Sequence, residues 1–265
     1  MKPEDIEENI VTKVCLVIGA GAGIGGSVGS RFAKEGYHAA LCRRSDARGL
    51  QTLVNRIEEE GGTATGHLLN AVEDDAIENL VTEVEKIGPI HTVLFNLGAQ
   101  IGNRSLETTT LKNFELGWKM ACFGLFRLAK VVIPAMESRG GGTLLVTSAT
   151  AAVRGNAGQH SHAAAMGGRR MLCQSLNAEY ASRGIHVAHV IIDGAVDAPD
   201  TLGKMLGQTQ FNALREARGG DKDGLLLPEQ IAETYFHLAH QHRSAWTHEL
   251  DLRAHSDLAW WNHEG

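Results

Sequence analysis

The sequence predicts a doubly wound α/β fold, in which a parallel seven-stranded sheet has helices on both faces. Three observations support this prediction. Short apolar runs alternate with helical patterns along most of the 265 residues. The strongest of these runs have no polar face, which is typical of strands covered on both sides, as a parallel sheet requires. A glycine-rich turn joins the first apolar run to the first helical pattern.

The elements follow one another in a regular order. The expected strands cover residues 13–18, 38–42, 63–68, 91–95, 143–147, 186–192 and 249–252. The third is the weakest pattern, and the last has alternating charges and is expected at an edge of the sheet. The expected helices cover residues 24–34, 46–60, 73–87, 111–136 and 163–182. Strand–helix alternation of this kind implies right-handed crossovers between parallel strands.

Composition narrows the classes of function. The net charge is −6 and the basic residues are scattered, so no nucleic-acid partner is expected, because such binding needs a clustered basic face. No apolar run is long enough to cross a bilayer, so no membrane partner is expected. Residues 1–12 are acidic and polar, unlike a secretory signal, and the expected location is cytoplasmic.

No linker or internal repeat divides the chain, so we expect one domain over residues 1–265. Residues 200–227 are the one segment without a clear pattern, and we expect an irregular insertion there, rich in Gly, Lys and Asp. It follows the carboxyl end of a strand. Ligands bind at that edge of such sheets, so this insertion is a candidate substrate lid.

The glycine-rich turn predicts a phosphate site. It holds Gly19, Gly21, Gly23, Ile24 and Gly25 at the junction of a strand and a helix. Glycines let the backbone approach a pyrophosphate closely, and the start of the helix offers free N–H groups to the anion. The alternative is a tight turn that binds no ligand.

The end of the second expected strand indicates which dinucleotide binds. An NAD site places an acid about 20 residues after the glycine turn, but Arg43 and Arg44 stand here. Arginine offers paired donors to a 2′-phosphate, so NADP(H) is favoured over NAD(H). Asp46 is interpreted as the N-cap of the next helix. The alternative is a solvated surface pair of arginines.

These motifs together resemble the short-chain dehydrogenase/reductase family over nearly the whole chain. Beyond the glycine turn, the matching segments are residues 95–98, 153–156, 193–199 and 228–232. The resemblance implies a Rossmann fold with NADP(H) as cofactor. It also implies these further cofactor contacts: Asn70, Ala71, Asn96, Gly98, Gly194 and Val196.

The family's usual catalytic side chains are missing at the matching positions. Its Asn, Ser, Tyr and Lys correspond to Ala121, Ala149, His162 and Met166. Its carboxamide-binding Thr corresponds to Ala198, and its adenine-binding Asp to Asn70. The features of the phosphate end are kept, whereas the side chains that serve the reacting carbonyl are replaced.

Two residues remain as catalytic candidates. His162 stands where the family has its acid/base, and an imidazole titrates near neutral pH without help from a lysine. Ser148 lies one residue from the family's serine position, and its hydroxyl is the second candidate. The chain has 13 histidines, so the alternative is that His162 is there by chance. His160 and His162 lack interleaved ligands, and no metal site is expected.

We therefore expect an NADPH-dependent oxidoreductase with a non-standard active site. Its small-molecule substrate would be an imine or iminium, an activated alkene or a carbonyl. Two alternatives stay open: a non-redox lyase, isomerase or cyclase, and an inactive NADP-binding protein. The resemblance also implies a homodimer or homotetramer built on the long helices before and after the fifth strand.

Overall fold

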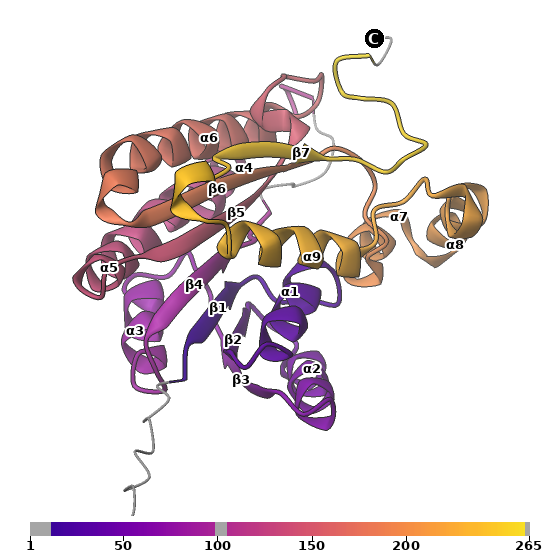
Figure 1. Ribbon diagram of the computed structural model, residues 1–265. Helices are drawn as coiled ribbons and strands as arrows, with labels where there is room; N and C mark the ends of the chain where they lie inside the picture. The colour runs from indigo at the N-terminus through magenta and orange to yellow at the C-terminus, as the bar shows by residue number, and fades with distance from the viewer. Residues whose placement is uncertain (1–11, 99–104, 263–265) are drawn as a thin grey trace, which may run out of the picture.

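The computed structural model describes residues 12–98 and 105–262, and it confirms the doubly wound α/β fold (Figure 1). Its parallel seven-stranded sheet has the order β3-β2-β1-β4-β5-β6-β7. The strands are β1 (Val14–Ile18), β2 (His38–Arg43), β3 (Thr63–Leu68), β4 (Ile90–Phe95), β5 (Gly142–Ala149), β6 (Ile185–Ile192) and β7 (Glu249–Leu252). Successive strands are added toward one edge of the sheet from β1 to β3 and toward the other edge from β4 onward. The ligand-binding crevice of such folds is therefore expected beside β1 and β4, where this order switches.

The continuous apolar runs form strands because both faces of the sheet are covered. In β1, Val14, Leu16 and Ile18 pack into one hydrophobic core. Cys15 and Val17 point to the opposite face and pack into a second core. A half-exposed strand would need polar residues at alternate positions, and β1 has none.

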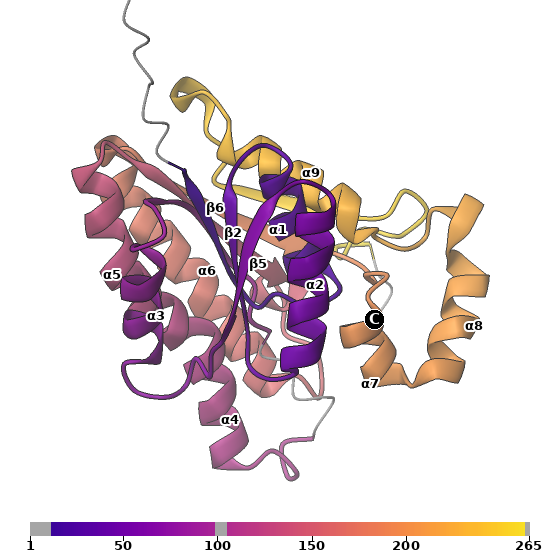
Figure 2. The same cartoon turned by 90° about the horizontal axis from the view of Figure 1, so that it is seen from below.

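Helices lie on both faces, as Figure 2 shows. One face carries α1 (Ile24–Ala33), α2 (Ala47–Glu59) and α9 (Pro228–Ala239), and the other carries α3 (Ala76–Val84), α5 (Gly124–Ser138) and α6 (His160–Tyr180). Asp46 caps α2 as expected, because its side chain accepts a hydrogen bond from the Gly49 N–H at 2.9 Å.

Three expected helices differ from the observed ones, and of these α6 begins at His160 rather than at residue 163. Residues 111–136 do not form one helix: α4 (Leu111–Trp118) is joined to α5 by the π-helical turn Lys119–Phe123. Helix α3 begins at Ala76 rather than at residue 73, because Asp75 adopts a left-handed backbone conformation (φ 57°). Helical periodicity shows neither kind of interruption, since both are local backbone features.

The expectation of an irregular segment at residues 200–227 was wrong, because much of it is helical. It contains the end of the π-helical turn Pro199–Gly203, α7 (Lys204–Leu206), α8 (Gln208–Arg218) and the 3₁₀ turn Gly220–Lys222. Residues 208–218 contain neither Gly nor Pro and include several good helix formers. The glycines that suggested irregular structure lie at the ends of these short elements, as Gly203 and Gly220 do, or outside them, as Gly207, Gly219 and Gly224 do.

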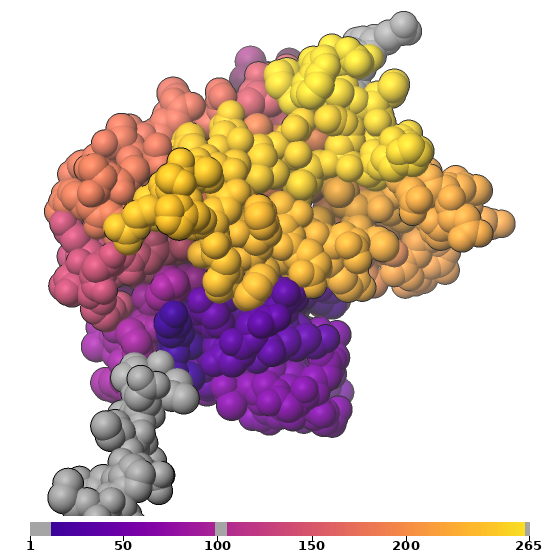
Figure 3. Space-filling model, in the orientation of Figure 1, coloured from indigo at the N-terminus to yellow at the C-terminus, as the bar shows by residue number. Residues whose placement is uncertain are grey.

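Helices α7 and α8 project from the body of the molecule in Figures 1 and 3. They follow β6, so they stand beyond the carboxyl ends of the strands. Within the described residues, no helix is both long and apolar enough to span a bilayer. Of the acidic segment from which a cytoplasmic location was inferred, only Thr12 is among the described residues.

Candidate functional site

A cavity of about 390 Å³ opens at the carboxyl ends of the strands. Five parts of the chain meet there: the turn after β1, the residues after β4, the end of β5, α6 and the segment after β6. The lining contains these predicted site residues: Gly19, Gly21, Gly23, Ile24, Gly25, Asn96, Gly98, Ser148, His162 and Val196. The fold therefore brings both ends of the predicted site to one cavity.

The glycine turn is held tightly against the sheet on one side and open on the other. Gly19 has φ 103°, and a Cβ atom added there would lie 2.8 Å from the Asn96 carbonyl oxygen. The Asn96 side chain also donates to the Gly19 carbonyl at 3.0 Å. At Gly21, by contrast, an added Cβ would meet no atom within 4 Å. This open side is where a phosphate has room to approach the backbone N–H groups.

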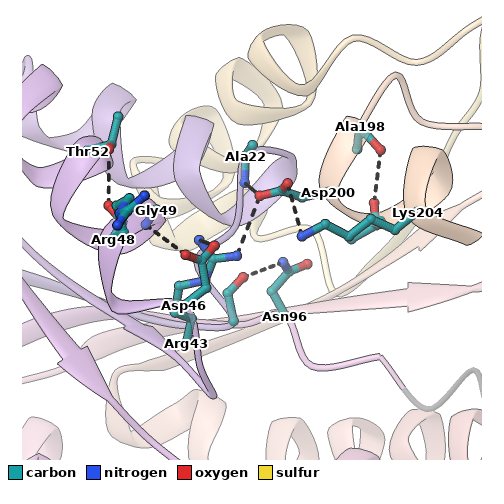
Figure 4. Close-up of polar contacts among 12 residues, drawn as sticks. Ala22, Arg43, Asp46, Arg48, Gly49, Thr52, Asn96, Ala198, Asp200 and Lys204 are labelled. Atoms are coloured by element: carbon teal, nitrogen blue, oxygen red, sulfur yellow. Dashed lines mark hydrogen bonds and ion pairs between the residues drawn. The ribbon is translucent and has the colours of Figure 1, made fainter. Parts of the chain in front are cut away.

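The two predicted arginines have different surroundings. Arg43 ends β2, and its side chain is only 15% exposed. Its guanidinium forms ion pairs with Asp46 at 3.2 Å and with Asp200 at 3.5 Å, as Figure 4 shows. Asp200 also accepts from the Ala22 N–H at 3.4 Å, so Arg43 lies close to the glycine turn. Arg44 is exposed to solvent.

Three other predicted cofactor contacts are not among the residues that line the cavity in the described part of the chain. Asn70 donates to the Glu73 carboxylate at 2.8 Å. Ala71 is buried, and its carbonyl accepts from Arg127 at 3.2 Å. Gly194 lies near Asp257 in the turn after β6. The cavity thus brings together the predicted residues of the glycine turn and of α6. Asn70, Ala71 and Gly194 instead contact other parts of the chain.

The far end of the cavity is largely apolar. Ala149 and Met166 line it, and Ala198 lines the cavity beside Gly23; the resemblance would put polar groups at all three positions. The Ser148 hydroxyl is buried and donates to the Met166 sulfur at 3.8 Å. Few polar atoms therefore remain to contact a reacting group here.

His162 is the predicted catalytic residue in this end of the cavity. Burial lowers its pKa, and the charge of Arg169 lowers it further, so the imidazole is neutral at pH 7. Nδ1 is buried and has no hydrogen-bond partner among the described residues. A buried nitrogen without a partner is costly, which is consistent with a bound group completing its hydrogen bonding.

Arg169 was missed by the sequence reasoning. It lines the cavity, is 1% exposed and has no carboxylate partner in the described part of the chain. Its three nitrogens donate to three backbone carbonyls: Nε to Ala121 at 2.9 Å, Nη1 to Thr147 at 2.6 Å and Nη2 to Leu97 at 2.6 Å. Burial lowers its pKa to about 10, so it keeps its charge at neutral pH.

The helical spacing could have revealed this arginine. His162, Met166, Arg169 and Cys173 recur on one face of α6, the face turned toward the sheet. An arginine in a stripe of otherwise half-buried or buried residues is unusual, because an unpaired buried charge is expensive. The spacing does not show which carbonyl groups accept hydrogen bonds from this arginine, because those groups belong to three separate segments.

The described residues contain no group of three or more His, Cys, Asp or Glu side chains arranged to hold a metal ion. The cavity lining offers backbone N–H groups, the Asn96 amide, the hydroxyl groups of Thr147, Ser148 and Thr201, the His162 imidazole and the buried Arg169 guanidinium.

Comparison with known proteins gives consistent matches. The family model described as short chain dehydrogenase matches residues 13–204. The short-chain reductase protein NovJ of Streptomyces niveus is 31% identical over 85% of this chain and 86% of its own length. A solved short-chain dehydrogenase of Rhodopseudomonas palustris is 30% identical, with a TM-score of 0.76 over 92% of this chain and 99% of that chain. A metagenomic short-chain oxidoreductase solved with NADP is 22% identical, with a TM-score of 0.75 over 91% of this chain and 97% of that one.

Proposed function

Because this chain belongs to the short-chain dehydrogenase family of oxidoreductases, we propose that it is an NADP(H)-dependent oxidoreductase with a non-standard active site. The observation that supports this most is the extent of one cavity. Its lining runs from the glycine turn to His162, Met166 and Arg169. A dinucleotide held at the turn would thus share a cavity with the residues where chemistry would occur.

The residues present fit NADP(H). The open side of Gly21 leaves room for phosphates beside backbone N–H groups, and Arg43 supplies a guanidinium at the end of β2. The solved relative with NADP bound supports the same choice. When bound, the reduced cofactor supplies a hydride. The chain's own residues would bind it, orient it and set the charge around the substrate.

Arg169 would set the electrostatic potential of the reaction site. Three hydrogen bonds to backbone carbonyl groups hold its guanidinium in place, and no carboxylate among the described residues neutralises its charge. Such a charge stabilises negative charge that develops on a substrate oxygen and disfavours a cationic substrate. Of the three substrate classes, a carbonyl or a carbonyl-activated alkene is therefore favoured over an iminium.

His162 would act as the proton-handling group. Its lowered pKa keeps it neutral at pH 7, so it would donate a hydrogen bond more often than a proton. An activated alkene suits such a site, because its oxygen needs less acid than a ketone reduced to an alkoxide.

We further propose that residues 1–265 form one NADP(H)-binding domain, with residues 200–227 as a substrate lid and a second copy of the chain as partner. Exposed aromatic side chains on and between α4 and α5 support the partner: Phe114, Trp118, Phe123 and Phe126 are each about 40% exposed. The molar mass in solution, measured by light scattering, tests this, and Phe126→Glu is expected to shift it toward the monomer.

The main proposal is tested in two steps. Calorimetry with NADPH and NADP⁺ measures binding. Absorbance at the NADPH band then follows turnover with panels of carbonyls, imines and enones. Binding without oxidation of NADPH by any panel would exclude the reductase and leave an NADP-binding protein. Turnover of a substrate in the absence of cofactor would instead support the non-redox alternative, which the apolar side chains of Ala149 and Met166 favour.

A further inference from the structure

Asp200 lies on the glycine turn, far from it in sequence. Its carboxylate accepts from the Ala22 N–H at 3.4 Å and lies 3.5 Å from the Arg43 guanidinium. The Lys204 ammonium group approaches the other oxygen at 3.3 Å. Figure 4 shows these donors directed at Asp200 from different elements. The Asp200 carboxylate thus contacts one backbone N–H group and two cationic side chains.

This set of donors is suited to a phosphate. Phosphate oxygens bind backbone amides, guanidinium groups and ammonium groups, and they do so more strongly than one carboxylate, because a phosphate carries more charge and more acceptor oxygens. Arg43 is mostly buried, whereas Asp200 is 29% exposed and Lys204 is 65% exposed. The two residues of the lid can therefore change rotamer without unfolding the segment.

We propose that Asp200 holds the place of the cofactor's 2′-phosphate, and that Lys204 is the second cation of that phosphate site beside Arg43. This inference rests on the proposed binding of NADP(H). The phosphate and the carboxylate compete for the same donors, so Asp200 turns away when NADP(H) binds. NADH has no 2′-phosphate and does not require this displacement.

The lid is linked to the site by this competition. Asp200 belongs to the π-helical turn Pro199–Gly203, directly after Ala198. A Cβ atom added at Gly23 would lie 2.9 Å from the Ala198 Cβ, so the chain just before the lid packs against the glycine turn. Release of Asp200 removes the polar contacts that join the start of the lid to the glycine turn and to Arg43. The 2′-phosphate thereby displaces Asp200 and loosens the start of the lid in one step.

The test measures binding by calorimetry rather than activity. Asp200→Asn keeps the size of the side chain and removes its charge, and Lys204→Met removes the ammonium. Asp197→Asn and Lys222→Met are matched controls, because they remove like charges nearby that pair with Arg215 and with the Glu216 carbonyl. The ligands are NADPH, NADH and 2′-AMP, which carries the 2′-phosphate alone.

We expect D200N to bind NADPH and 2′-AMP ~10-fold more tightly, a change of about 1.4 kcal/mol, and NADH within ~2-fold of the wild type. K204M should bind NADPH ~10-fold more weakly. Both effects should shrink at high salt, because the groups are partly exposed. The two control variants should match the wild type.

Three results would overturn the inference while NADPH binding stands. The first is an unchanged affinity of D200N for NADPH. The second is weaker binding of NADH by D200N, which would make Asp200 a ribose-binding acid. The third is an affinity of K204M for NADPH that equals that of its control, Lys222→Met. If neither the wild type nor D200N binds NADPH or 2′-AMP, the proposed cofactor itself is refuted and the inference with it.

Discussion

Replacing Arg169 with methionine removes the buried cation at the inner end of the cavity. Three backbone carbonyls, those of Leu97, Ala121 and Thr147, then lose a charged donor at 2.6 to 2.9 Å. Methionine fills a similar volume, so the change is mainly electrostatic and hydrogen-bonding rather than a cavity. We expect a lower free energy of unfolding and a higher pKa for His162.

The magnitude follows from the three contacts. A buried carbonyl left without its donor costs about 1–3 kcal/mol. We take about 1 kcal/mol for each, because the variant also no longer has to desolvate a guanidinium. The sum is about 3 kcal/mol, which for a chain of this size lowers Tm by roughly 6–12 °C.

The assay is a thermal melt followed by circular dichroism, with Arg170→Met as the control. Arg170 is the next residue, but its pair with Glu249 is partly exposed, with side chains 32% and 25% exposed. Such a pair contributes about 0–1 kcal/mol, so R170M should melt close to the wild type. NMR titration of His162 provides a second readout. Its pKa should rise in R169M but stay below the ordinary value, because burial is the larger cause of its shift.

Two results would refute this reasoning. If R169M melts within ~2 °C of R170M, the guanidinium does not hold the three carbonyl groups. If the His162 pKa does not rise in R169M, the charge of Arg169 does not reach the imidazole, and the proposed electrostatic role fails even if the stability falls.

Three further predictions concern other residues. His162→Phe should lower kcat by ~100-fold. In a pH–rate profile, the variant should also lose any rise of rate as pH falls below about 6.5. An unchanged profile would show that His162 takes no part in proton transfer. Arg43→Leu should weaken NADPH binding by ~10- to 100-fold and leave NADH unchanged in calorimetry, whereas equal losses for both would contradict a 2′-phosphate contact. His189 is buried and its pKa is lowered from 6.5 to about 4, chiefly by burial, so the stability that its neutral form contributes is present above pH 6.5 and is lost as pH falls toward 4. The loss amounts to about 3 kcal/mol. Urea melts at about pH 7 and about pH 4.5 should therefore show a smaller acid sensitivity for His189→Leu than for the wild type. Part of the acid sensitivity should remain, because burial also lowers the pKa of His91 to about 4.

Patterns within short segments predicted most of the fold. The seven strands lie where they were expected, and Asp46 caps α2 as expected. The two main errors, at the π-helical turn Lys119–Phe123 and in residues 200–227, have different origins. A pattern of side chains does not report a shift from α-helical to π-helical hydrogen bonding. In residues 200–227 the glycines suggested irregular structure, although residues 208–218 contain several good helix formers.

The glycine turn and Arg43 could be predicted as a site because each depends on neighbours in sequence. A strand, a turn and the helix that follows it form a local unit, and the end of β2 lies beside it in any doubly wound sheet of this order. The same holds for His162, whose place on α6 follows from the resemblance to the family.

The chain's sequence by itself determined the sheet, the glycine turn and the family. Only the tertiary structure decided which groups surround the charged side chains of the site. Arg169 donates to carbonyls 22 to 72 residues away, and Asp200 meets Ala22 from 178 residues away. The interaction between two charges depends on the distance between them and becomes stronger when they are buried. Neither that distance nor the burial of a given side chain can be read from the amino-acid sequence.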